Sequence, residues 1–128
     1  MTQTVADLPE DLREIVAKTL TEDNKIVASD RAASDSFGQS VAISSDGTRV
    51  VVGVYNHSGG VSDAGAAYIF LRTGTSWAQE AKIVASDRAA SDQFGTSVSI
   101  SSDGSRVVVG AYAQDGGVTD AGAAYIYG

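Results

Sequence analysis

Short apolar runs, separated by turns rich in Gly, Ser and Asp, follow one another from residue 25 to residue 128. The Asp46-Gly47 pair between the first two runs is typical of a tight hairpin, because glycine tolerates positive φ. Since β-branched and aromatic residues dominate the runs, they predict strands that form one antiparallel sheet. The first four predicted strands are Phe37–Ile43, Arg49–Val54, Ala66–Arg72 and Trp77–Ser86.

The whole pattern returns with a period of 57 residues. Aligning Lys25–Leu71 with Lys82–Gly128 gives 36 identical residues in 47 positions. The largest differences set Asn56-His57-Ser58 against Ala113-Gln114-Asp115. So close a repeat predicts two equivalent structural units, and it fits a recent duplication or an engineered origin equally well.

Both faces of each predicted sheet are apolar. Because side chains alternate along a strand, Val41 and Ile43 share one face, and the smaller Ser40 and Ala42 share the other. The Val50–Val52 run is apolar on both sides, as in a strand with both faces buried. A large face packed on a small face lets sheets stack at native density, as the blades of a β-propeller do. The alternative, a two-sheet sandwich, would show one polar face per strand.

The motifs of both repeats resemble the FG-GAP repeat, the blade unit of integrin α-chain propellers. Asp-x-Phe-Gly-x-Ser-Val stands at Asp35–Val41 and at Asp92–Val98, and VVVG-x-Tyr follows at Val50–Tyr55 and Val107–Tyr112. The tyrosine of VVVG-x-Tyr replaces the proline of the family's GAP element. The resemblance covers residues 25–128 and implies an all-β fold of two four-stranded propeller blades, in an extracellular or cell-surface protein.

The calcium-binding form of the family has a loop with several aspartates. The matching hairpins here read SSDGT and SSDGS, with Asp46 or Asp103 as the one carboxylate of each. Calcium takes 6–8 oxygen ligands, so the family's calcium site does not carry over and no cofactor is expected.

The limits of the repeated region do not coincide with the limits of whole blades. Residues 25–30 read as the end of a fourth strand, and the second repeat stops after its third strand. Two blades cannot close a ring, because propellers have about 4–8 blades. We therefore expect strand exchange with a neighbouring copy in a closed homotrimer of six blades or homotetramer of eight. The exchanged residues would be Lys25, Ile26, Val27, Ala28 and Ser29. The alternative is a fragment of a longer propeller.

Residues 1–24 lie outside the repeat. Asp7, Pro9 and Glu10 are placed as in a capped helix start. Apolar residues follow at helical spacing and predict a short helix: Leu8, Leu12, Ile15, Val16 and Leu20. Such a helix is marginal alone, so it would cover a propeller edge or act as an adaptor.

The net charge of −7 is concentrated at the N-terminus, where residues 1–24 hold six acidic and two basic residues. The sequence has no basic stripe, no membrane-length apolar run and no signal-peptide pattern, so neither nucleic acid nor a membrane is an expected partner. The absence of cysteine excludes disulfides and thiolate metal sites, and it leaves the compartment open.

The sequence shows no catalytic constellation, and we expect no enzyme. His57, the one histidine, lies in a loop, where a solvated role is commoner than catalysis. The longest loops differ most between the repeats, and loops on a rigid scaffold often bind ligands. They supply the candidate binding residues Asn56, His57, Ser58, Asp63, Gln114, Asp115 and Asp120. Asp115 and Asp120 could also form a weak calcium site.

Three functional hypotheses follow. The first is a non-catalytic module that self-assembles into a ring and serves as a scaffold. The second is an adhesion or ligand-binding propeller with a protein or glycan ligand. The third, a fragment of an enzyme, would need carboxylates around the ring axis, where the first strands offer Gln39, Ser40, Thr96 and Ser97.

Overall fold

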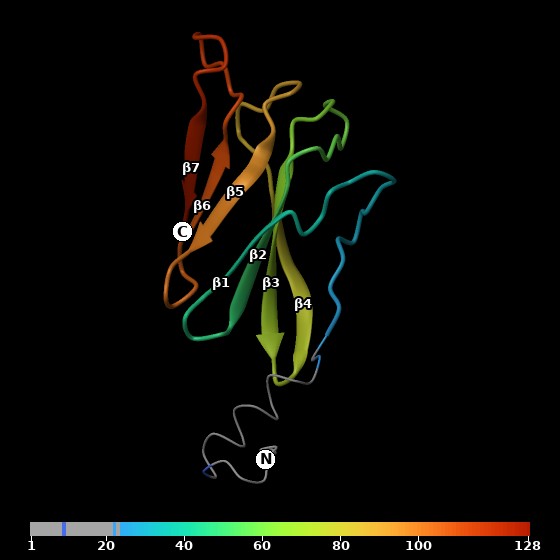
Figure 1. The fold of residues 1–128 in the computed structure, drawn as a ribbon, viewed down its shortest axis with the longest axis vertical. Helices are drawn as coiled ribbons and strands as arrows, with labels where there is room; N and C mark the ends of the chain where they lie inside the picture. Colours follow the sequence, from blue (N-terminus) through green and yellow to red (C-terminus); the bar gives the residue numbers. More distant parts are fainter. Residues whose placement is uncertain (1–8, 10–21, 23) are drawn as a thin grey trace, which may run out of the picture.

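The computed structural model describes Pro9, Glu22 and residues 24–128. Seven strands form two antiparallel sheets, with sheet order β1-β2-β3-β4 and β5-β6-β7 (Figure 1). The strands are β1 Ser40–Ile43, β2 Arg49–Val54, β3 Ala66–Thr73, β4 Ser76–Ile83, β5 Phe94–Ile100, β6 Val107–Ala111 and β7 Ala123–Tyr127. In this part of the chain no helix is long and apolar enough to cross a membrane. The helix predicted within residues 1–24 lies almost wholly outside the described residues and stays a prediction.

The tight hairpins at Asp46-Gly47 and Asp103-Gly104 are confirmed. The Asp46 carboxylate accepts hydrogen bonds from the Thr48 hydroxyl at 2.7 Å, the Ser44 hydroxyl at 2.7 Å and the Thr48 N–H at 3.0 Å. These donors hold the pKa of Asp46 below its usual range, with the Thr48 hydroxyl contributing most. Ser105 and Ser101 do the same at the second hairpin and lower the pKa of Asp103 to about 2.

Two predicted strand ends are wrong, and the first is the start of β1, which lies at Ser40 rather than Phe37. β4 ends at Ile83 rather than Ser86, because the chain there leaves its sheet and crosses to the second one, where Ala85 is buried.

The exchange strand predicted at Lys25–Ser29 aligns with residues 82–86 of the other repeat, and only the first two of those residues lie in β4. In the structure the segment is irregular. Ile26 and Ala28 pack against the first sheet, and the Ser29 N–H donates to Gln79 Oε1 at 3.0 Å.

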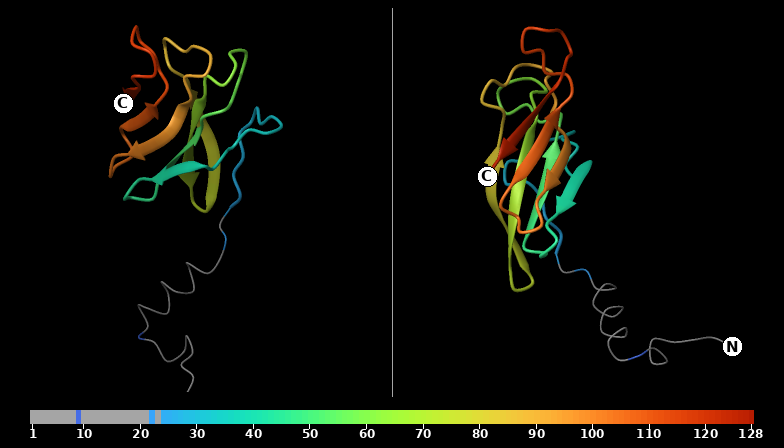
Figure 2. Two further views of the ribbon diagram at one scale, coloured as in Figure 1. Left: turned by 45° about the horizontal axis from the view of Figure 1, so that its top comes forward. Right: turned by 90° about the vertical axis from the view of Figure 1, so that its left-hand side faces the viewer.

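The two sheets pack face to face, large side chains against small ones, as the alternation predicts. We call the side of a sheet bearing Val41 and Ile43, or Val98 and Ile100, its large face, and the opposite side its small face. The large face of the second sheet packs on the small face of the first. Phe94 lies fully buried between them, with its ring centroid 5.4 Å from that of Tyr125. β5 is the strand that contacts β1 and β2 (Figure 2).

At one end the sheets meet through their backbones. Phe94 forms a parallel bridge with Gly65, and the Phe94 N–H donates to the Ala64 carbonyl at 2.9 Å. The Ser40 hydroxyl donates across the contact to the Gly95 carbonyl at 2.7 Å. A side chain at Gly65 has no room, because its Cβ would lie 1.9 Å from the Phe94 carbonyl oxygen. The spacing between the two sheets is therefore set by backbone contact.

Candidate interaction faces

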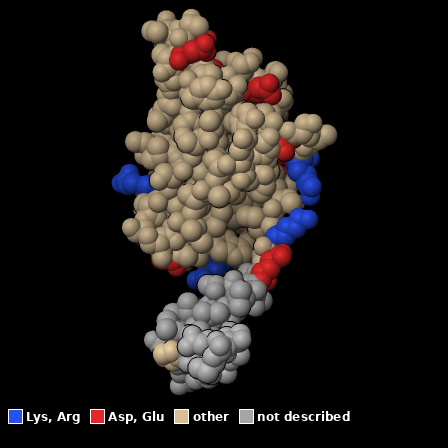
Figure 3. Space-filling model, viewed as in Figure 1, with Lys and Arg blue, Asp and Glu red and all other residues tan. Residues whose placement is uncertain are grey.

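Each sheet has one outer face, turned away from the other sheet, and both outer faces carry exposed apolar side chains. The outer face of the first sheet is its large face, where Val41 is 60% and Ile43 is 59% exposed. The outer face of the second sheet is its small face, where Ile126 is 70% and Val108 is 38% exposed. Figure 3, in the view of Figure 1 that shows both sheets from the side, has its charged side chains at the margins of the molecule. A two-sheet sandwich would instead turn polar faces outward.

The equivalent residues of the other repeat are covered. Ile69, the counterpart of Ile126, is 9% exposed, and Val51, the counterpart of Val108, is 0% exposed. Val98 and Ile100, the counterparts of Val41 and Ile43, pack against the core between the sheets. The two outer faces are therefore the two halves of a contact that the chain already forms once between its own sheets.

Two pairs of equivalent glycines show the same contrast. A Cβ on Gly95 would lie 2.5 Å from the Ala66 carbonyl oxygen of the neighbouring sheet, whereas one on Gly38 would meet nothing within 4 Å. A Cβ on Gly65 would collide with Phe94, whereas one on Gly122 would lie 3.0 Å from the Tyr112 carbonyl oxygen of its own sheet. Only one member of each pair is pressed against another sheet within the described structure.

The first candidate binding loop, which contains Asn56, Ser58 and Asp63, is used inside the chain. Asn56 Oδ1 accepts from the Ser36 N–H at 2.9 Å, and Asn56 Nδ2 donates to the Ser34 carbonyl at 2.9 Å. Four backbone carbonyls of this loop accept bonds from the segment that leads into β5, and that of Ser62 accepts from the Ser91 N–H at 2.8 Å. Those of Ser58 and Gly59 accept from Arg88 Nη2 at 3.0 and 3.1 Å, and that of Asp63 accepts from the Gln93 N–H at 3.1 Å. The loop is thus part of the contact between the sheets.

The equivalent loop of the second repeat is open. Asp115 and Asp120 are exposed, and Asp115 Oδ1 accepts from the Asp120 N–H at 2.8 Å. Gln114 is nearly buried, and its Nε2 donates to Asp87 Oδ2 at 3.3 Å. Among the described residues no group of three or more His, Asp or Glu side chains is placed to hold a metal ion.

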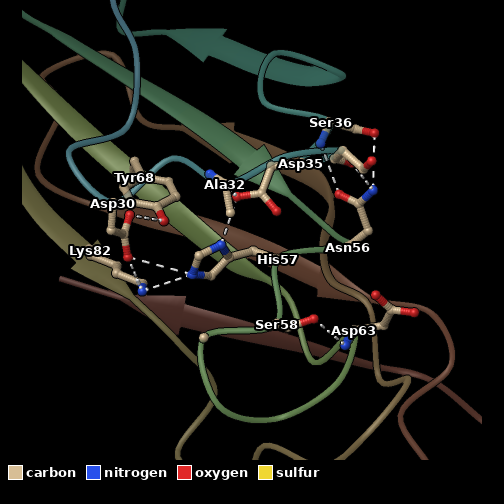
Figure 4. A network of polar contacts seen from close by, with 12 residues as sticks. Asp30, Ala32, Asp35, Ser36, Asn56, His57, Ser58, Asp63, Tyr68 and Lys82 are labelled. Carbon is tan, nitrogen blue, oxygen red and sulfur yellow. Dashed lines mark hydrogen bonds and ion pairs between the residues drawn. The ribbon is translucent and has the colours of Figure 1, made fainter.

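His57 is buried, so its predicted place in solvent is wrong. Its Nδ1 lies 2.9 Å from Asp35 Oδ2, and its Nε2 lies 3.0 Å from Lys82 Nζ (Figure 4). A neutral ring with its proton on Nδ1 satisfies both contacts, because it donates to Asp35 and accepts from the ammonium group. These partners are 22 and 25 residues away in the chain, and no local pattern reveals them.

Asp30 joins this cluster to β3. Its carboxylate accepts from the Tyr68 hydroxyl at 2.6 Å and from Lys82 Nζ at 2.6 Å, and it lies 3.5 Å from His57 Nε2. The Lys82 hydrogen bond, and after it that of Tyr68, lower the pKa of Asp30 to about 2. In the second repeat Tyr125 donates to Asp87 at 2.6 Å in the same way. In each repeat an aspartate thus links the segment before the first strand to the third strand.

Acid should weaken the first of these ties. Because the folded pKa of Asp30 is depressed from 3.8 to about 2, its contribution is full above pH 4 and is lost between pH 4 and pH 2. The Asp30 side chain is 42% exposed, so solvent screening limits the effect to about 1 kcal/mol. The unfolding free energies of the parent and of Asp30→Asn, measured in urea at pH 5 and pH 2, should therefore converge by about that amount. Lys82→Met should show the same convergence, and a constant difference from pH 5 to pH 2 would contradict the assignment.

A comparison with known families matches the FG-GAP repeat twice, at residues 20–70 and 77–127. The two matches start at equivalent positions of the 57-residue period, and the second starts within β4. No curated protein matches the chain.

Proposed function

Since the chain belongs to the FG-GAP repeat family, we propose that it is a non-catalytic propeller module that assembles head to tail with copies of itself into a closed ring. The family is one of binding and adhesion modules, and its repeats are propeller blades. The proposed role is that of a scaffold, in which the ring presents its loops several times. The same family relationship supports an extracellular or cell-surface location.

One observation carries the proposal: the two outer faces are equivalent to the two surfaces that already pack against each other between the sheets. The small outer face, with Val108 and Ile126, matches the surface that already receives the second sheet. The large outer face, with Val41 and Ile43, matches the surface that packs into it. Such an interface joins two different surfaces, so it propagates from copy to copy and closes if the rotation fits. We call this contact between copies the seam.

The edge of the second sheet supports strand exchange at the seam. β7 has β6 on one side and no strand on the other among the described residues, and an open edge invites pairing. In the first sheet Ala67 pairs with Ile83 and Tyr68 pairs with Lys82. Moved by one 57-residue period, these pairs place Ile26 and Lys25 of the next copy beside Ala124 and Tyr125. The exchange thus involves two residues of the predicted segment.

The mass of the chain in solution tests the proposal. Three copies would give six blades and four would give eight, both within the usual propeller range of about 4–8. Light scattering after size exclusion should show three or four chain masses, independent of loading over a tenfold range. A monomer with a cooperative thermal transition would contradict self-assembly, and it would leave further blades of a longer polypeptide as the partner.

A second candidate function is ligand binding at a cavity of about 210 Å³ between the sheets. Two tyrosines and three amide or hydroxyl side chains line it: Gln39, Tyr55, Gln93, Thr96 and Tyr112. An aromatic ring flanked by hydrogen-bonding groups suits a sugar, with one polar and one apolar side. Retention of the chain on immobilised glycans, and its loss in Tyr112→Ala, would support this function, whereas equal retention of both would oppose it.

A further inference from the structure

The aspartate ties of the two repeats differ in one partner. In the first repeat Asp30 binds the Tyr68 hydroxyl and also Lys82 Nζ, each at 2.6 Å. In the second repeat Asp87 keeps the tyrosine bond, from Tyr125 at 2.6 Å. Within the described residues no lysine or arginine forms an ion pair with Asp87. The second tie therefore lacks the cation that the first one has.

The position of the missing cation follows from the strand register. Lys82 reaches Asp30 from β4, where it lies opposite Tyr68. The equivalent place, opposite Tyr125, is beside the open edge of β7. The residue one period before Lys82 is Lys25, which is exposed and forms no ion pair among the described residues.

We infer that the Asp87 carboxylate of one copy binds Lys25 of the next copy, which completes a tie shared between two chains. This inference rests on the proposed head-to-tail ring and names the polar contact that sets its register. Contact between the apolar faces does not depend on their exact alignment. A hydrogen bond from an ammonium group to one carboxylate oxygen does, and it therefore sets the register of the two strands at the seam. Gln114, which donates to Asp87 Oδ2 at 3.3 Å, takes the place that His57 has in the first tie.

A single isolated seam allows the test. In a chain carrying Ile126→Lys only the large outer face can bind, and in a chain carrying Ile43→Lys only the small one can. Mixing the two should give one seam, in which Lys25 comes from the Ile126→Lys chain and Asp87 from the Ile43→Lys chain. Titration calorimetry of this pair then reports the affinity of the seam alone.

Lys25→Glu in the Ile126→Lys chain should weaken binding roughly thirtyfold, because a carboxylate then faces Asp87 across the seam. The same Lys25→Glu change in the Ile43→Lys chain is the matched control, since that lysine is outside the seam, and it should leave the affinity within about twofold. Asp87→Lys in the partner of the weakened chain should restore most of the lost affinity. Recovery of affinity in this charge swap would show that the two residues pair directly. If Lys25→Glu only destabilised the fold, Asp87→Lys would not restore binding.

The outcomes separate the two proposals. If the seam forms and Lys25→Glu has no effect, the inference about Lys25 is wrong and the ring is unaffected. If both positions of Lys25→Glu weaken the seam equally, the lysine acts within its own chain and the inference is again wrong. If the parent pair forms no seam, the ring fails and this inference fails with it.

Discussion

Ile43→Lys and Ile126→Lys are each expected to convert the ring into a monomer, and an equimolar mixture of the two is expected to form a dimer and stop there. Both residues are more than half exposed in the chain, so neither change should unfold it. By their counterparts Ile69 and Ile100, the lysine at 126 would be buried at the seam and the lysine at 43 partly buried, each as an unpaired charge in an apolar contact. Such a charge costs about 3 kcal/mol or more and weakens association more than hundredfold.

The dimer is the informative species, because it separates head-to-tail packing from face-to-face packing. If two large outer faces bound each other, Ile126→Lys would still dimerise by itself. Thr75→Lys, in the exposed turn between β3 and β4, serves as a surface-charge control and should leave the parent mass unchanged. Light scattering and equilibrium sedimentation of each variant and of the mixture measure the result. A mixture that stays monomeric, or that forms the full ring, would contradict the proposed seam.

Gly65→Ala should be the most damaging small substitution in the chain, while the equivalent Gly122→Ala should be mild. Both glycines have positive φ, +87° and +84°, so each alanine carries a similar backbone cost of about 1 kcal/mol. Only Gly65 faces a second sheet, where its Cβ would lie 1.9 Å from a backbone oxygen of Phe94. Parting the two sheets adds about 3 kcal/mol, as overpacking of a core does.

Urea unfolding in the monomeric Ile43→Lys background measures this difference without the contribution of assembly. In a chain without Ile43→Lys, which can assemble, Gly122→Ala should also affect assembly. Its counterpart Gly65 touches the strand that follows it in the next blade, so an alanine at 122 should block the seam although the chain remains folded. Equal losses of unfolding free energy at 65 and 122 would contradict the backbone contact. A full-size ring formed by Gly122→Ala would contradict the equivalence of the seam with the intrachain contact.

The strands were predictable where a residue's own repeat decides its structure. Arg49–Val54 forms β2 with the predicted limits, because the two strands that it pairs with, β1 and β3, are in the same blade. Phe37 and Phe94 head almost identical sequences, yet β5 starts at Phe94 and β1 starts only at Ser40. Phe94 bonds to Ala64 and Gly65 of the preceding blade, whereas Phe37 has no preceding blade in the described chain. The sequence of one repeat therefore could not predict this difference in strand start, because the cause is contact with the preceding blade.

The candidate interaction faces were predictable in kind, and the polar ties were not. The alternation of large and small residues on the first strand predicted faces that stack, and the core between the sheets follows it. The role of Asp30 was missed because its partners Tyr68 and Lys82 are 38 and 52 residues away. One signal was present: aspartate, tyrosine and lysine recur together with the period, as Asp87, Tyr125 and Lys25. Their side-chain distances required the fold.

The identity of Lys25–Asp30 and Lys82–Asp87 also creates a competition during folding. The edge of β3 accepts Lys82 and Ile83 in the folded chain, and the identical Lys25 and Ile26 can make the same backbone bonds to it. The choice between the two segments therefore depends on the residues before them. Glu80 binds Arg49 at 2.9 Å, and Trp77 packs on the core of the first sheet, where the earlier segment has Asp23 and Leu20. Refolding should accordingly partition between a correctly paired chain and a swapped one, and the indole of Trp77 should set the ratio.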